Sequence, residues 1–120
     1  MATKVLQIRA AQMAALREVP LLEFEARLTL HLERNFGAKL EDLSPDQVEN
    51  LVREGMRKAR LYGIASRTNV RRFVEHMVGL GPEFDEQPWA QAILAATQLR
   101  EADKLDRIDD YEQFEYNRRR

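Results

Sequence analysis

The chain has 120 residues, enough for one domain with one core, and its 44% hydrophobic and 32% charged residues are ordinary for a globular protein. A net charge of −1 favours neither nucleic acid nor an anionic membrane surface, and the absence of cysteine excludes disulfides and thiol chemistry. No apolar run approaches the ~18 residues of a membrane span, and the first nine residues lack the apolar core of a signal peptide. We therefore expect a cytoplasmic protein.

The first part of the chain has helical periodicity, and no run of alternating residues predicts a strand. A first helix is predicted over residues 8–18 and a second from Pro20 to about Asn35, because proline is tolerated in a first helical turn. The apolar side of the second helix is formed by Leu21, Phe24, Leu28 and Leu32. Leu30 points almost opposite and is a weak candidate for contact with a partner protein.

The third helix has the clearest start in the sequence. Ser44 is predicted to be its N-cap, with Pro45 as first helical residue and Gln47 completing a capping box. The helix is predicted to end at Gly63. Gly55 lies on the apolar face one turn before another small residue, so we expect a second helix to approach closely there.

Two further helices are predicted before residue 100. The fourth starts near residues 66–68 and stops at 79–82, where glycine and proline end a helix. Asp85 is predicted to cap the fifth helix, with Phe84 and Trp89 forming a hydrophobic staple across the cap. The predicted core of the domain contains Phe24, Leu28, Leu32, Val48, Leu51, Val52, Phe73, Met77, Trp89 and Ile93.

The fold class predicted is all-α, a compact bundle of about five helices in residues 1–100 with a charged helical extension in residues 101–120. Apolar residues recur every three positions in this extension, and a row of that spacing turns by 60° per step around a straight α-helix. We expect such a row to wrap a partner surface, although folding back on the domain is the open alternative. The predicted partner-binding residues here are Leu105, Ile108, Tyr111 and Phe114.

The sequence predicts no catalytic, metal-binding or cofactor-binding residues. Ser44 and Ser66 stand where helix caps belong, and neither His31 nor His76 belongs to a pattern with metal-ligand spacing. A partly buried structural role is expected for both histidines. The four aspartates between residues 103 and 110 are expected to form a solvated face.

Two alternatives of other classes remain open. Asp85, Glu86 and His76 would be the residues of a small hydrolase, if a deep pocket joined them. The basic residues between 53 and 72 would suit a phosphate backbone, although no aromatic residues lie between them for base stacking. An ordinary charged helix face is the simpler interpretation of that region.

Several segments in order resemble a family of small bacterial proteins encoded beside type VI secretion components and effectors. The likeness covers about residues 8–95, and residues 37–39 and the tail after residue 100 depart from the family pattern. The first matching residues are Ile8-Arg9, Gln12-Met13, Phe24, Arg27, His31-Leu32 and Phe36. The others are Val52, Gly55, Ala59, Tyr62-Gly63-Ile64, Ser66, residues 73–81, Phe84-Asp85, Pro88-Trp89-Ala90 and Ile93-Leu94.

This resemblance implies a non-enzymatic adaptor or co-chaperone for effector loading. Its expected partners are a secreted effector, the effector's chaperone or a PAAR-type spike protein, with neither nucleic acid nor membrane, and self-association is open. An immunity protein that blocks a cognate toxin is the alternative within the same class. The resemblance supplies no catalytic motif and no cofactor.

Overall fold

The computed structural model describes residues 21–119. The predicted helix over residues 8–18 and the residue Pro20 lie outside the described residues. Within 21–119 every regular element is helical, which confirms the predicted all-α fold class.

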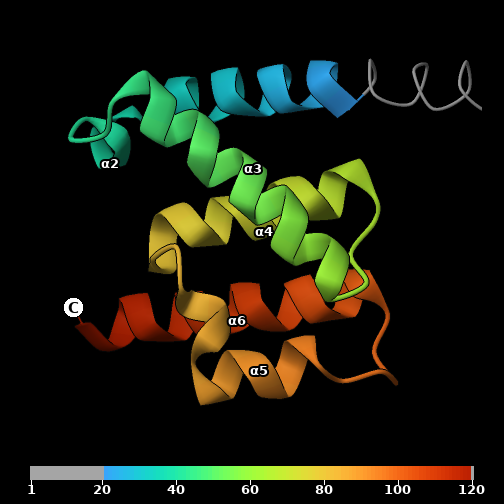
Figure 1. Cartoon of the computed structure of the whole chain (residues 1–120). Helices are drawn as coiled ribbons and strands as arrows, with labels where there is room; N and C mark the ends of the chain where they lie inside the picture. The colour runs from blue at the N-terminus through green and yellow to red at the C-terminus, as the bar shows by residue number, and fades with distance from the viewer. Residues whose placement is uncertain (1–20, 120) are drawn as a thin grey trace, which may run out of the picture.

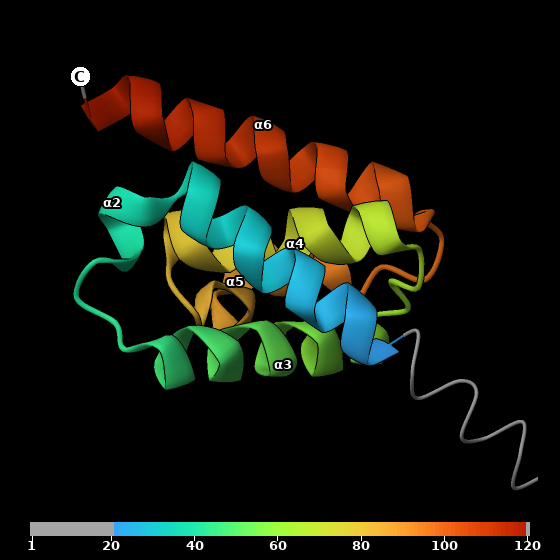
Figure 2. The same ribbon diagram turned by 90° about the horizontal axis from the view of Figure 1, so that it is seen from above.

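Helix α4 lies in the middle of a layered bundle. A helix over residues 21–35 is followed by α2 (Gly37–Leu40), α3 (Pro45–Leu61), α4 (Arg67–Leu80), the 3-10 turn η1 (Phe84–Glu86), α5 (Pro88–Leu94) and α6 (Glu101–Arg119). Helix 21–35 and α3 cover one side of α4, and α5 and α6 cover the other (Figure 1). Seen from above, helix 21–35 runs obliquely across α4 (Figure 2).

Two apolar clusters fill the spaces on either side of α4. The cluster beneath helix 21–35 contains Leu28, Leu32, Leu40, Val48, Val52 and Val74. The cluster that joins α4 to α5, α6 and the end of α3 contains Ala59, Ile64, Val70, Phe73, Met77, Phe84, Ala90, Leu94, Leu105 and Ile108. Six of the ten predicted core residues are buried, and the other four, Phe24, Leu51, Trp89 and Ile93, pack partly buried against these clusters.

The ends of α3 and α4 lie where the local sequence predicts them. The Ser44 hydroxyl accepts from the Gln47 N–H at 3.2 Å, and the Gln47 side chain accepts from the Ser44 N–H at 2.8 Å, so the capping box is confirmed. Gly63 follows α3 with a φ of 75°, and Gly81 ends α4 with a φ of 112°, backbone conformations that favour glycine. Ser66 caps α4.

The predicted start of the fifth helix is wrong. Phe84–Glu86 form a 3-10 turn, and α5 starts at Pro88 after Gln87. Asp85 does not cap it because its carboxylate is buried and accepts from Lys58 Nζ at 2.9 Å and from the Tyr62 hydroxyl at 2.7 Å. Lys58 of α3 and Tyr62 at the end of that helix thus bind the acid that the local pattern assigned to a helix cap.

Helix α6, which the sequence predicts as an extension beyond a domain of residues 1–100, packs as part of the bundle. Leu105 and Ile108 are fully buried in the core, so the prediction that these two residues dock on a partner is wrong. The 60° turn per step explains the whole row, since it starts facing α4, reaches the half-buried Tyr111 and ends at Phe114, which is 62% exposed. Only the second half of the row remains on the surface.

A polar seam also joins α4 to α6 along their length. Its members are Asn69, Arg72 and His76 on α4 and Glu101, Asp106, Asp109 and Glu112 on α6. Arg72 donates to Asp106 and Asp109 at 2.6 Å each, and the ring nitrogens of His76 lie within hydrogen-bond distance of Asp109 and Glu112. The acids expected to form a solvated face therefore include two that bind α4, while His76 is buried in a structural role, as predicted.

Glu101 closes the seam at the start of both helices. Its carboxylate accepts from the backbone N–H of Ala65 at 2.8 Å, from that of Ser66 at 3.1 Å and from the Asn69 amide at 3.0 Å. These hydrogen bonds, the one from Ala65 first, lower the pKa of Glu101 from 4.5 to about 2. The bonds favour the ionised form and hold α6 beside the α3–α4 connection.

Replacing Glu101 with glutamine should make the folded protein less sensitive to acid. Because the folded-state pKa lies below the ordinary value, the stabilisation is complete above about pH 4.5 and is lost as the pH falls towards 2. Urea unfolding of both proteins at several pH values should show the largest difference at neutral pH and a shrinking one below about pH 4.5. A difference that stayed constant across this range would contradict the assignment.

Candidate functional site

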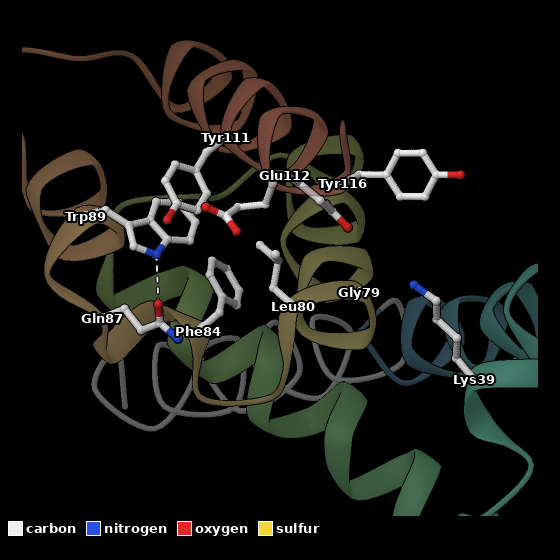
Figure 3. Close-up of a pocket in the computed structure, with 10 residues that line it drawn as sticks. Lys39, Gly79, Leu80, Phe84, Gln87, Trp89, Tyr111, Glu112 and Tyr116 are labelled. Atoms are coloured by element: carbon white, nitrogen blue, oxygen red, sulfur yellow. Dashed lines mark hydrogen bonds between the residues drawn. The ribbon is translucent and has the colours of Figure 1, made fainter. Parts of the chain in front are cut away.

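The candidate site is an open cavity of about 420 Å³ at the end of the bundle where α4 and α6 finish. Its wall is formed by Lys39, Gly79, Leu80, Phe84, Gln87, Trp89, Tyr111, Glu112, Glu115 and Tyr116 (Figure 3). The lining comes from α2, α4, η1, α5 and α6, so it depends on the tertiary arrangement rather than on any one segment. We call it the aromatic pocket.

A stacked pair of rings forms one wall of the aromatic pocket. Trp89 and Tyr111 lie face to face with ring centroids 3.6 Å apart and an angle of 13° between the planes (Figure 3). The indole N–H donates to the side chain of Gln87 at 2.9 Å, which fixes the ring at the start of α5. The predicted packing of Trp89 near Phe84 is confirmed, since their ring centroids lie 6.2 Å apart.

The floor of the pocket belongs to the core. Phe84 is 1% exposed and packs against Phe73, with ring centroids 5.3 Å apart. Gly79 lines the cavity at the last turn of α4, where the carboxylate of Glu112 fills the place that a side chain would take. The absence of a side chain at this position lets α6 bring Glu112 to His76.

Charged groups stand at the edges of the cavity. Glu112 is held by His76, and Glu115 accepts from Arg118 at 2.9 Å. Lys39 lies across the cavity from the stacked rings and forms no ion pair with another residue of the described range (Figure 3). Because His76 and Arg118 already bind the two carboxylates, the aromatic rings are the surface offered to a partner, and they suit an apolar side chain entering from outside.

The predicted partner-binding residues fall into three groups. Leu105 and Ile108 lie in the core, as described above, and Tyr111 forms a wall of the aromatic pocket. Phe114 is exposed on the same half of α6, and Leu30 is 45% exposed on helix 21–35. Tyr116, which is not among the predicted residues, is 57% exposed and also lines the pocket.

Two residues of the hydrolase alternative, Asp85 and His76, belong to different networks, and the third, Glu86, is exposed. The carboxylate of Asp85 is bound by Lys58 and Tyr62, whereas His76 contacts Asp109 and Glu112. Burial, and then the hydrogen bond to Asp85, raises the pKa of Tyr62 to about 12. A phenol with this pKa keeps its proton at neutral pH and stabilises the buried carboxylate.

The three arginines of α3 are exposed, as an ordinary charged helix face predicts, whereas Lys58 is largely buried against Asp85. Arg53 pairs with Glu25 and Glu49, and Arg57 pairs with Glu54. Carboxylates thus already occupy two of the guanidinium groups that the nucleic-acid alternative would use. Residues 21–119 contain no group of three or more acids, histidines or cysteines that could hold a metal ion.

Comparisons with known proteins add no family assignment. No protein-family model, no curated protein and no solved structure matches the chain. In residues 21–119 there is no helix with the length and apolar character needed to cross a membrane. The resemblance to proteins of type VI secretion clusters therefore stays a prediction.

Proposed function

We propose that this protein works by binding another protein, as a non-enzymatic adaptor or co-chaperone for type VI effector loading, and that the aromatic pocket is its contact site. The observation that supports the proposal most is the aromatic surface around this cavity. Tyr116, which is 57% exposed, lines it together with the half-buried Trp89 and Tyr111. Phe114, which is 62% exposed, does not line the cavity but follows Tyr111 in the apolar row of α6. Aromatic residues on a concave surface are typical of the few positions that dominate binding energy at protein interfaces.

The position of the pocket favours an interface over a simple solvated end of a helix. Buried residues under the pocket, chiefly Phe84, hold the stacked rings in place even when no partner protein is bound. A partner would therefore meet a pre-formed surface and lose little free energy in ordering it. The partner classes come from the resemblance: a secreted effector, its chaperone or a PAAR-type spike protein.

The proposal can be tested by titrating the purified effector, effector chaperone and spike protein of the same gene cluster with the full chain. Replacing Phe114 with serine, or Tyr116 with alanine, should weaken the binding of one of them by about tenfold or more, equal to ~1.4 kcal/mol. Both side chains are exposed, so we expect the fold to survive, and circular dichroism checks this. Deleting residues 101–120 is a poorer test because it would also remove Leu105 and Ile108 from the core.

Leu22→Ser is the matched control. Leu22 is 62% exposed, as Phe114 is, but it lies on helix 21–35 in the opposite layer of the bundle. Unchanged affinity in this variant, together with weaker binding in the two others, supports the aromatic pocket. Equal affinities in all four proteins, or no binding by any of the three candidate partners, would overturn the proposal.

A further inference from the structure

A second cavity lies between helix 21–35, α3 and the start of α4. Arg67 and Val70, which line it, lie at the opposite end of α4 from Gly79 and Leu80 of the aromatic pocket. The second cavity has a volume of about 300 Å³, and residues that line it include Phe24, Met56, Arg60, Ile64, Arg67 and Val70. Four of these are apolar and form a floor continuous with the core cluster around α4. We call this cavity the arginine pocket.

The charged residues that line the arginine pocket are all positive. Arg60 and Arg67 are both exposed at its edge, and no carboxylate belongs to its lining. Neither guanidinium forms an ion pair with another residue in 21–119. Arg53 and Arg57, which share the exposed face of α3 with Arg60, are both paired with glutamates. The guanidinium carbon of Arg67 lies 5.8 Å from the centre of the Phe24 ring, which leaves its N–H groups for an external acceptor.

We propose that the arginine pocket binds an acidic, apolar segment of a partner protein, with an apolar side chain on the floor and neighbouring carboxylates on Arg60 and Arg67. Guanidinium groups bind carboxylates through paired hydrogen bonds, and the apolar floor favours a segment that carries both kinds of side chain. The volume lies at the lower end of the ~300–1,000 Å³ typical of small-molecule pockets, which suits one large side chain of a protein.

Charge also argues against the chain's own first residues as the occupant. Residues 1–20 contain Lys4, Arg9, Arg17 and a single acid, Glu18. That segment carries the same sign of charge as the two arginines, and like charges disfavour the contact. A partner segment rich in aspartate and glutamate is complementary instead. This inference does not depend on the aromatic pocket, since it uses other residues at another place.

The test is a fluorescence anisotropy titration of the full 120-residue chain with a labelled peptide of sequence Asp-Glu-Phe-Leu-Glu-Asp. The matched probe has asparagine and glutamine in place of the acids. We expect the acidic peptide to bind at least about tenfold more tightly than the neutral one, and its affinity to fall as salt is raised. The double variant R60Q/R67Q should lose about tenfold in affinity for the acidic peptide and bind the neutral peptide unchanged.

R27Q/R57Q is the control, because it removes the same charge from two exposed arginines that do not line the pocket. Its affinity for the acidic peptide should stay within about twofold of the unchanged protein. Equal binding of the two peptides, or equal losses in the two double variants, would overturn the proposal. Tighter binding of decanoate than of the acidic peptide would also overturn it, because the pocket would then suit a small anionic amphiphile. A dimer of the chain that the peptide dissociates would overturn it as well, because the occupant would then be a second copy of the chain.

Discussion

Replacing Asp85 with alanine should lower the free energy of unfolding by about 3–5 kcal/mol, the range found when one partner of a buried ion pair is removed. The side chain of Asp85 is 4% exposed and that of Lys58 is 12% exposed, so water replaces little of what is lost. Lys58 would keep only the carbonyl oxygen of Pro82, at 3.0 Å, as a hydrogen-bond acceptor. The Tyr62 hydroxyl would lose its carboxylate acceptor as well.

Glu86→Ala is the control for this prediction. Glu86 is the exposed neighbour of Asp85 in the same turn, so its replacement changes the local charge equally and should alter stability by less than about 0.5 kcal/mol. Urea denaturation of the three proteins measures both effects. A loss below about 1 kcal/mol for Asp85→Ala would show that the Lys58–Asp85–Tyr62 contacts do not form as described.

Asp85 also shows where local sequence patterns stop being informative. The capping box of α3, the serine cap of α4 and the glycines that end both helices depend on residues within four positions of one another, and these predictions are confirmed. An acid just before a new helix satisfies the same local rule. The competing partners of Asp85, Lys58 on α3 and Tyr62 at its C-cap, lie 27 and 23 positions earlier, and nothing within the turn indicates them.

The C-terminal helix was predictable in its geometry and not in its packing. The three-residue spacing correctly predicts a row that turns around the helix, from the buried Leu105 to the exposed Phe114. Which end of the row faces the core depends on which helix packs most against α6, and here that helix is α4. The matching stripe on α4 is a signal that could have been used, since Asn69, Arg72 and His76 recur every three or four positions opposite the acids of α6.

The aromatic pocket could be predicted only in pieces. Trp89 and Tyr111 are conspicuous in the sequence, yet their stacking requires α5 and α6 to lie side by side. Lys39 and Glu115 reach the same cavity from α2 and α6, and neither belongs to a motif. The arginine pocket has a weak sequence signal, because Arg60 belongs to the basic stripe of α3 and Arg67 follows Ser66 at the start of α4.

Replacing Gly55 with leucine should cost about 1–3 kcal/mol of stability, because α3 and α4 cross closely at this position, as the sequence predicts. A Cβ atom at Gly55 would lie 2.6 Å from Cγ2 of Val74 and 2.8 Å from the sulfur of Met77. Both side chains are buried, and a valine in a helix has one strongly preferred rotamer, so neither can move aside at low cost. The helices would have to separate, and core contacts would be lost.

Gly79→Ala, where α4 packs against α6, provides the comparison. An added methyl group there would meet only the carboxylate end of the Glu112 side chain, which can move aside at the cost of its contact with His76, while His76 keeps Asp109 as a partner. Alanine also favours a helix over glycine by up to ~1 kcal/mol, so this variant should differ from the unchanged protein by less than about 1 kcal/mol in urea unfolding. If Gly55→Leu were as stable as Gly79→Ala, the close crossing of α3 and α4 could not be what requires glycine at position 55.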